Sequence, residues 1–234
     1  MKKILALAAA LLIAAPPSAL AAIGCTLSNP AEDLKYLFPE MTSYREDLKE
    51  FPKLKDGAAL FAGLPDRLGG GLDPIYETFE TPYTVYGVFQ GKKRIGVVHG
   101  VNVPGKGGVI QVFLSADPDT GAIRRFFFQR LESPAARVLR DKAFRARFEG
   151  LTLADFYKHD YYAAVPPAGA SNESDRVALV GEPKGLSADG RADYEAALRG
   201  IRKNLVLLDV FVYGRRFEPF FERAKAAAAK GVKP

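Results

Sequence analysis

Cysteine and histidine are scarce in this 234-residue chain, and their scarcity excludes several kinds of site. Cys25 is the only cysteine, which excludes an internal disulfide framework, iron–sulfur ligation by thiolates and covalent c-type haem. The two histidines, His99 and His159, have no partners at the spacing of metal ligands, so no metal site is expected. No order of serine, histidine and aspartate suggests a hydrolase. The sequence therefore points to no catalytic residue and leaves open whether the protein is an enzyme.

The first residues have the pattern of a secretory signal. Lys2 and Lys3 precede an apolar run at 4–15, and small residues at 19–22 end the segment. Because this run is too short for a spanning helix with its own stop signal, residues 1–24 are predicted to be a signal peptide. No second hydrophobic stretch reaches membrane-spanning length. The mature chain is therefore predicted to be exported, to the periplasm or the outer face of a bacterial membrane.

Cys25 follows the signal directly, in Ala22-Ile23-Gly24-Cys25. This pattern resembles a bacterial lipoprotein signal, in which the cysteine is acylated and becomes the new N-terminus, although Ala22 stands where leucine is usual. The alternative is ordinary cleavage after Ala21, which would leave a free thiol able to pair between molecules. We favour lipidation of Cys25, which predicts an N-terminal membrane anchor.

The charge of the chain favours a membrane surface over nucleic acid as a neighbour. The formal net charge is +6, and Lys2 and Lys3 of the predicted signal contribute to it. Such a mild excess suits a protein near an anionic membrane surface. The basic residues are dispersed along the chain, so no nucleic-acid partner is expected.

Alternation of apolar residues and turn signals predict a sheet followed by helices. Strands are expected at 82–90, 94–99, 109–115 and 122–129, and helices at 30–38, 134–148, 153–158 and from Ser187 onward. This order predicts an α+β fold with an antiparallel or mixed sheet of at least four strands and helices packed on one face. The predicted divisions are the signal at 1–24, a helical or irregular extension at 25–80, the main domain at 81–213 and a basic tail at 214–234. The tail reads as a solvated or frayed helix, and 161–185 as a long loop.

Four short motifs occur in an order that resembles a known family. They are Gly107-Gly108-Val109-Ile110 at a strand entry, a hairpin over 117–123, Glu132-Ser133-Pro134, and Phe144 to Gly150 with Phe148 between. In this order they resemble the FMN-binding domain family, the extracytoplasmic flavin-carrying domain in subunits of the Rnf complex and the sodium-pumping NADH:quinone reductase. The resemblance covers about residues 80 to 210.

The resemblance implies a binding site for flavin mononucleotide (FMN). By analogy with the family, Leu131, Glu132, Ser133 and Pro134 would line the flavin. Alternatively, Pro134 merely starts a helix and Glu132 is a favourable charge at its positive end. Gly107 and Gly108, with Lys106 beside them, could form a backbone nest for a phosphate, or simply a tight turn at the strand entry.

One family feature is missing. Many members attach FMN through its phosphate to a threonine at the start of the last helix, where free N–H groups favour an anion. The corresponding stretch, 185–190, offers Ser187 but no threonine, and Thr152 is the last threonine in the chain. Asp189 in the same stretch would also repel a phosphate. Covalent attachment to threonine is therefore excluded, which leaves non-covalent FMN, a serine link at Ser187, or no flavin.

Two functions follow as hypotheses. The first is an exported, lipid-anchored flavoprotein in electron transport, in which FMN relays electrons from a membrane redox complex or a quinone- or cytochrome-linked donor. The second is a flavin-free domain of the same architecture that serves as a binding or assembly module. Architecture alone does not decide between them.

Overall fold

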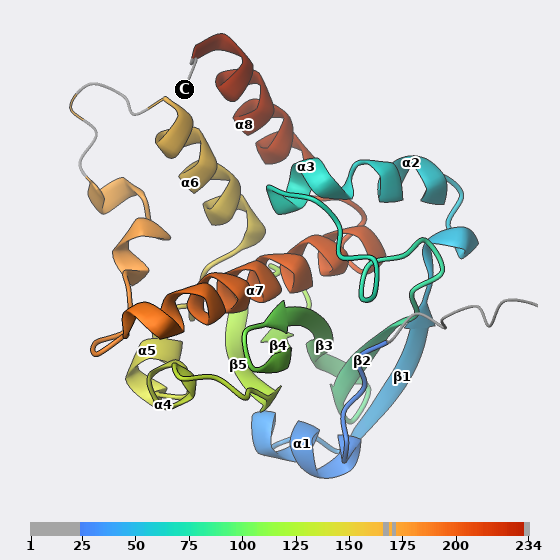
Figure 1. The fold of residues 1–234 in the computed structure, drawn as a ribbon. Coiled ribbons are helices and arrows are strands. Elements are labelled where there is room, and N and C mark those ends of the chain that lie inside the picture. Colours follow the sequence, from blue (N-terminus) through green and yellow to red (C-terminus); the bar gives the residue numbers. More distant parts are fainter. Residues whose placement is uncertain (1–23, 166–168, 170–171, 232–234) are drawn as a thin grey trace, which may run out of the picture.

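A five-stranded antiparallel sheet forms the centre of the molecule (Figure 1). The computed structural model describes residues 24–165, 169 and 172–231. In spatial order the strands are β1 (Ser43–Lys49), β2 (Tyr83–Gln90), β3 (Lys93–Gly105), β4 (Gly108–Ala116) and β5 (Ile123–Arg130). Each strand pairs with its sequence neighbour in antiparallel register. The predicted α+β class is confirmed, while the predicted signal lies almost wholly outside the described residues.

The strands form where apolar residues alternate, and both faces of the sheet are covered. On β3, Val97, Val101 and Val103 belong to the larger hydrophobic core, whereas Val98 belongs to a second cluster on the opposite face. β3 is longer than predicted, because it continues through Gly105 to a tight turn before β4. The strand pairs therefore place the glycine-rich turn 105–108 at one end of the sheet.

The edge strand β1 was not predicted, since it falls in the extension expected to be helical or irregular. Its sequence, Ser-Tyr-Arg-Glu-Asp-Leu-Lys, is exposed at nearly every position. It therefore shows no alternation between apolar and polar residues. Charged side chains on an exposed edge strand discourage pairing with other chains. The segment 25–80 thus contributes a strand to the same sheet as the segment 81–213.

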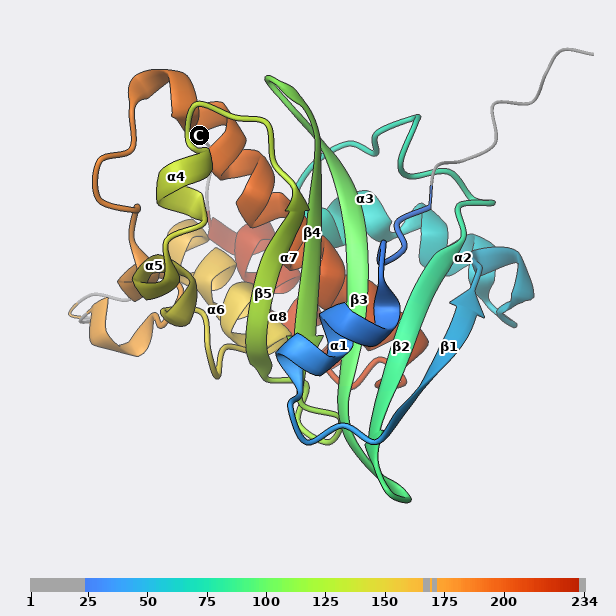
Figure 2. The same cartoon turned by 90° about the horizontal axis from the view of Figure 1, so that it is seen from below.

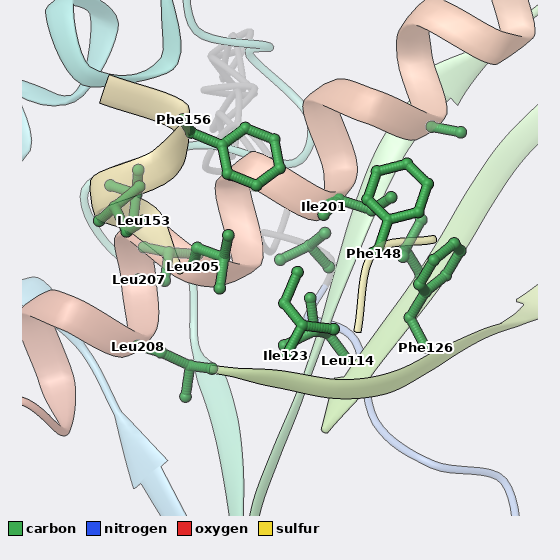
Figure 3. Packing of buried hydrophobic residues seen from close by; sticks show 14 of the residues in the cluster. Leu114, Ile123, Phe126, Phe148, Leu153, Phe156, Ile201, Leu205, Leu207 and Leu208 are labelled. Atoms are coloured by element: carbon green, nitrogen blue, oxygen red, sulfur yellow. The ribbon is translucent and has the colours of Figure 1, made fainter. Parts of the chain in front are cut away.

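The long helix α7 (Arg191–Phe211) lies across one face of the sheet (Figure 1). Helical spacing predicts one apolar stripe of Tyr194, Leu198, Ile201, Leu205 and Leu208, and four of these are buried while Leu198 is partly buried against the core. Figure 3 shows Ile201, Leu205 and Leu208 packed near Leu114 and Ile123 of the sheet. At Gly200 a Cβ would lie 2.9 Å from a methyl group of Val112, so glycine allows the helix to approach β4 closely.

An outer layer of helices covers α7. It contains α2 (Gly57–Ala62), α3 (Leu64–Leu68), α6 (Leu153–Ala164) and α8 (Glu218–Gly231). α6 and α8 pack side by side, and Phe221 of α8 belongs to the main core (Figure 1). A salt bridge of 2.5 Å joins Arg67 of α3 to Glu218 of α8. The predicted tail therefore contains a helix that packs through Phe221 and Ala224, while most of its later side chains are exposed.

The helix α1 (Pro30–Leu37) covers the opposite face of the sheet (Figure 2). It ends before Pro39, as the sequence predicted. The ring of Phe38 lies against Gly96 of β3, where a Cβ would be 2.2 Å from the ring. Cys25, Leu27 and Leu34 are buried in the same cluster. Helical cover is thus not restricted to the face that carries α7.

The segment 134–148 was predicted as one helix, and this prediction is wrong. It forms two short helices, α4 (Ala136–Leu139) and α5 (Lys142–Ala146). Asp141 separates them in an extended conformation, and its side chain accepts a hydrogen bond of 2.8 Å from the Phe144 N–H. Within the described part of the predicted loop 161–185, α6 continues to Ala164 and short 3-10 turns lie at Asn172–Ser174 and Ala178–Val180. Within the described residues, no helix is long and apolar enough to cross a membrane.

Candidate functional site

The structure brings the turn between β3 and β4 against the segment that was predicted to line a flavin. At Gly107, a Cβ would lie only 2.0 Å from the carbonyl oxygen of Glu132. Gly108 has a φ of +132°, a conformation that L-residues rarely adopt. Gly107, Gly108 and Glu132 are therefore neighbours in space. Glycine is needed at 107 because the two backbone segments touch.

This contact gives a stability prediction. Gly107→Ala is expected to destabilise the protein by roughly 1–3 kcal/mol, because the added methyl must push two backbone segments apart. Gly70→Ala is the matched control, since a Cβ there meets nothing within 4 Å and the backbone has no positive φ. Urea unfolding of both variants measures the difference. Equal midpoints for the two variants would contradict the close contact.

The residues from Leu131 to Pro134 do not form a continuous apolar wall. Leu131 is buried in the main core, whereas the Glu132 and Pro134 side chains are exposed. Glu132 pairs with Arg130 on the surface, at 3.2 Å. The Ser133 hydroxyl accepts a hydrogen bond of 3.0 Å from the Ala135 N–H. Three of the four side chains thus face solvent or stabilise the local turn.

The start of α7 lies beside the same turn. The Lys106 N–H donates a hydrogen bond of 2.6 Å to Asp193, and its ammonium group lies 3.3 Å from Asp189. Ser187 accepts a hydrogen bond of 3.2 Å from the Gly190 N–H, so it caps the 3-10 turn Ala188–Gly190 that precedes α7. All three predicted site segments therefore meet at one end of the sheet.

The space between these segments is filled. A Cβ on Gly190 would lie 2.8 Å from the Cβ of Ala135, so the two backbones are in direct contact. Asp193 is fully buried, and its second carboxylate oxygen has no hydrogen-bond partner among the described residues. A phosphate at the start of α7 would meet this carboxylate and the one of Asp189, both of which repel it. The residues present therefore do not fit an FMN whose ring lies between the turn and α7.

Sequence reasoning missed Ala135, Gly190 and Asp193 as the residues that determine this geometry. Ala135 and Gly190 are small residues without functional groups, and their contact joins positions that are distant in the chain. Asp193 lies in the first turn of α7, where an acidic residue is an ordinary helix-start signal. Nothing in the local sequence distinguishes these three residues from common structural ones.

A second group of polar residues lies on α7 and was also missed. The buried Glu77 carboxylate lies 2.6 Å from Arg199 and 3.0 Å from Lys203. Burial alone would raise the pKa of Glu77, but hydrogen bonds and charges from Arg199 and Lys203 outweigh it and lower the pKa. Burial lowers the pKa of Lys203, and Glu77 opposes that shift. This cluster holds the chain around Glu77 against α7.

His99 is buried beneath α7 rather than available as a ligand. Its Nδ1 lies 2.8 Å from the Asn204 side-chain oxygen, and the Asn204 amide donates to the Val112 carbonyl at 3.0 Å. The other histidine, His159, pairs with Asp175 at 2.7 Å. Among the described residues, no group of three or more histidine, cysteine, aspartate or glutamate side chains could hold a metal ion.

Cys25 lies in the second hydrophobic cluster with only 5% of its surface exposed. Burial raises the pKa of its thiol to about 12, although the positive charge of Lys203 opposes the shift. As a thiol, Cys25 is therefore an inert core residue. A lipid on this sulfur would require residue 25 to leave the cluster.

No protein-family model matches the sequence, and neither does any curated protein. Among solved structures, the crystal structure of Shewanella oneidensis NqrC is similar, with 16% sequence identity and a TM-score of 0.41. The match covers 86% of this chain and 90% of NqrC. A TM-score below 0.5 is too low for this likeness to support the assignment of a family, a cofactor or an activity.

Proposed function

We propose that this protein is a flavin-free binding module, built on an architecture that its motifs share with flavin-carrying domains. The observation that carries this proposal is the contact between Ala135 and Gly190, which brings the chain just after Pro134 directly against the start of α7 and leaves no room for a flavin ring between them. The Ser133 and Ser187 hydroxyls support it, because each accepts a hydrogen bond from a nearby backbone N–H. A flavin needs a flat apolar slot, donors for its carbonyls and a site for its phosphate. The carboxylates of Asp189 and Asp193, which lie beside Lys106, would repel that phosphate.

A second candidate is an electron carrier with non-covalent FMN that works with a membrane redox complex. One observation favours it, namely that the turn at Gly107, the Glu132 segment and the start of α7 all meet at one end of the sheet. In this case FMN would lie on the exposed surface around Lys106, Glu132 and Ser187. The cofactor would supply the redox chemistry, and the protein would set access to it and its potential.

Absorption spectroscopy separates the two candidates. We expect the purified chain to be colourless and to leave the absorbance and fluorescence of added FMN unchanged, because the flavin position is filled. A yellow protein whose colour moves to the supernatant on acid precipitation would establish the electron carrier with non-covalent FMN. Colour that remains with the precipitate would indicate a covalent link between flavin and protein. If that link is to Ser187, the Ser187→Ala variant would lose it.

We also propose that the chain is exported and anchored by a lipid on Cys25. The basic start, the short apolar run and the position of the cysteine support this proposal. Cys25→Ser is then expected to move the protein from the membrane fraction to the soluble fraction, as measured by fractionation and immunoblotting. If the distribution does not change and Cys25 of the native protein reacts with iodoacetamide only after unfolding, the residue is a core thiol and the lipid anchor is wrong.

A further inference from the structure

The helices α6 and α8 lie on the far side of α7 from the sheet (Figure 1). Side chains of both helices line a groove of about 640 Å³. Its lining includes four aromatic side chains, which are Tyr157, Tyr161, Tyr162 and Phe220. The α8 wall contains the small residues Ala224, Ala226 and Ala227, which leave the groove open. Clefts of this size accept ligands of drug-like dimensions, and their surfaces are predominantly apolar.

The rim of the groove is positively charged. Lys158, Arg223 and Lys230 line it, and no aspartate or glutamate is among the described lining residues. The Arg223 guanidinium lies 4.5 Å from the centre of the Phe220 ring, and the Lys158 ammonium lies 6.0 Å from it. None of these three cations takes part in the ion pairs found between described residues, whereas Lys225 on another side of α8 pairs with Asp66. The groove therefore combines an apolar floor with cations that are available to an anionic group.

The two adjacent tyrosine rings of the groove are not parallel, so they do not form a slot for a planar ligand. Tyr161 and Tyr162 are tilted by 59° to one another, with ring centres 5.6 Å apart. The Phe220 ring already carries the two cations of the rim. A planar ring system is held best between parallel surfaces, while a flexible hydrocarbon chain can follow tilted rings and small alanine side chains. The shape thus favours a ligand with a flexible apolar tail.

We propose that this groove binds a free long-chain carboxylate, with its hydrocarbon tail along the aromatic floor and its carboxylate between Lys158, Arg223 and Lys230. The proposal deepens the binding role proposed above by naming a ligand class and a site. It concerns the α6–α8 side of the molecule, so it can fail or succeed independently of flavin binding. Charge complementarity selects the carboxylate head, and the volume and lining select the tail.

Isothermal titration calorimetry with dodecanoate below its micellar concentration tests the proposal on the full chain. We expect saturable binding at one site and an affinity that falls roughly fourfold for each methylene removed from the ligand, equivalent to about 0.8 kcal/mol. Dodecanol, which lacks the charge, is expected to bind at least tenfold more weakly. Binding that does not depend on chain length or on the carboxylate would overturn the proposal.

Two tryptophan variants locate the site. Ala227→Trp fills the groove and is expected to weaken dodecanoate binding at least tenfold, whereas Ala229→Trp places the same ring on the exposed side of α8 and serves as the matched control. Lys158→Ala combined with Arg223→Ala should reduce binding of dodecanoate but not of dodecanol. Circular dichroism spectra of the variants are the control that shows whether each one is folded. If Ala227→Trp binds dodecanoate normally, or if the chain binds only vesicles of anionic phospholipid, the groove is not a fatty-acid site.

Discussion

Replacing Glu77 with alanine is expected to lower the free energy of unfolding by about 3–5 kcal/mol, because it leaves a buried lysine without its counter-charge. Lys203 is only 2% exposed, and its ammonium group donates to the Asn102 carbonyl at 3.0 Å besides pairing with Glu77. A buried cation that loses its partner must either stay charged at a high cost or lose its proton. Urea unfolding at neutral pH measures the loss.

The double variant Glu77→Ala with Lys203→Met is the control. Removing both charges is expected to recover most of the lost stability. A buried ion pair stabilises a fold little more than apolar residues of similar volume at the same positions. Arg199, which also contacts Glu77 and is partly exposed, can turn its charge toward water in the double variant. If Glu77→Ala were as stable as the wild type, the cluster would not be the buried ion pair described above.

Two buried groups, His99 and Asp209, are expected to change the free energy of unfolding with pH in opposite directions. Burial lowers the pKa of His99 to about 4, opposed in part by its hydrogen bond to Asn204 and assisted by the charge of Lys203. Between pH 4 and 6.5 the unfolded chain therefore binds more protons at this residue. As the pH falls below 6.5, protonation of His99 in the unfolded chain therefore lowers the free energy of unfolding, by roughly 3 kcal/mol in total.

Asp209 acts in the opposite direction. Burial raises its pKa to about 6, while the Phe217 N–H and the charge of Arg67 oppose the shift and Glu218 adds to it. Between pH 3.8 and 6 the folded chain binds more protons at this residue, so its contribution to stability grows as the pH falls, again by roughly 3 kcal/mol. The two windows overlap, so the two contributions largely cancel in the wild type.

Two variants separate these contributions. Asp209→Asn is expected to increase the loss of stability between pH 6.5 and 4 by about 3 kcal/mol, because only the His99 contribution remains. His99→Gln is expected to reduce the loss of stability between pH 6.5 and 4 by a similar amount, because only the Asp209 contribution remains. Urea unfolding at both pH values gives the comparison, and contributions from other titrating groups cancel between wild type and variant. Parallel pH profiles for all three proteins would show that neither residue is held at its shifted pKa.

The sequence predicted the fold well where apolar residues recur with a clear period. It predicted the fold poorly where contacts with other elements determine the secondary structure. Alternating apolar residues located β2 to β5, and the stripe from Tyr194 to Leu208 located α7. β1 was missed because its charged residues lie at an exposed edge, where no alternation is required. The single helix predicted at 134–148 ignored Asp141, whose capping of α5 breaks the chain into two helices.

The candidate site was predictable only in part. The residues that the resemblance assigned to the flavin wall and to the phosphate nest include Glu132 and Gly107, which are neighbours in the structure. The resemblance could not predict that Ala135 and Gly190 touch, because that contact depends on where α7 begins relative to β5. The buried polar residues of α7 were also missed, since Lys203 and Asn204 look like solvent-exposed helical residues until their partners on other elements are known. The groove between α6 and α8 likewise exists only through the packing of two segments separated by about fifty residues.

The salt bridge between Arg67 and Glu218 links the first third of the chain to its last helix. Arg67 is only 7% exposed, and Phe217 and Phe221 complete the hydrophobic core that the earlier segments begin. Without residues 212–231, Arg67 lacks its carboxylate partner and the ring of Phe221, and the core beside α6 is incomplete. Native packing of α3 and α6 therefore requires the last helix, and we expect the fold to be completed only after the C-terminal segment has been synthesised.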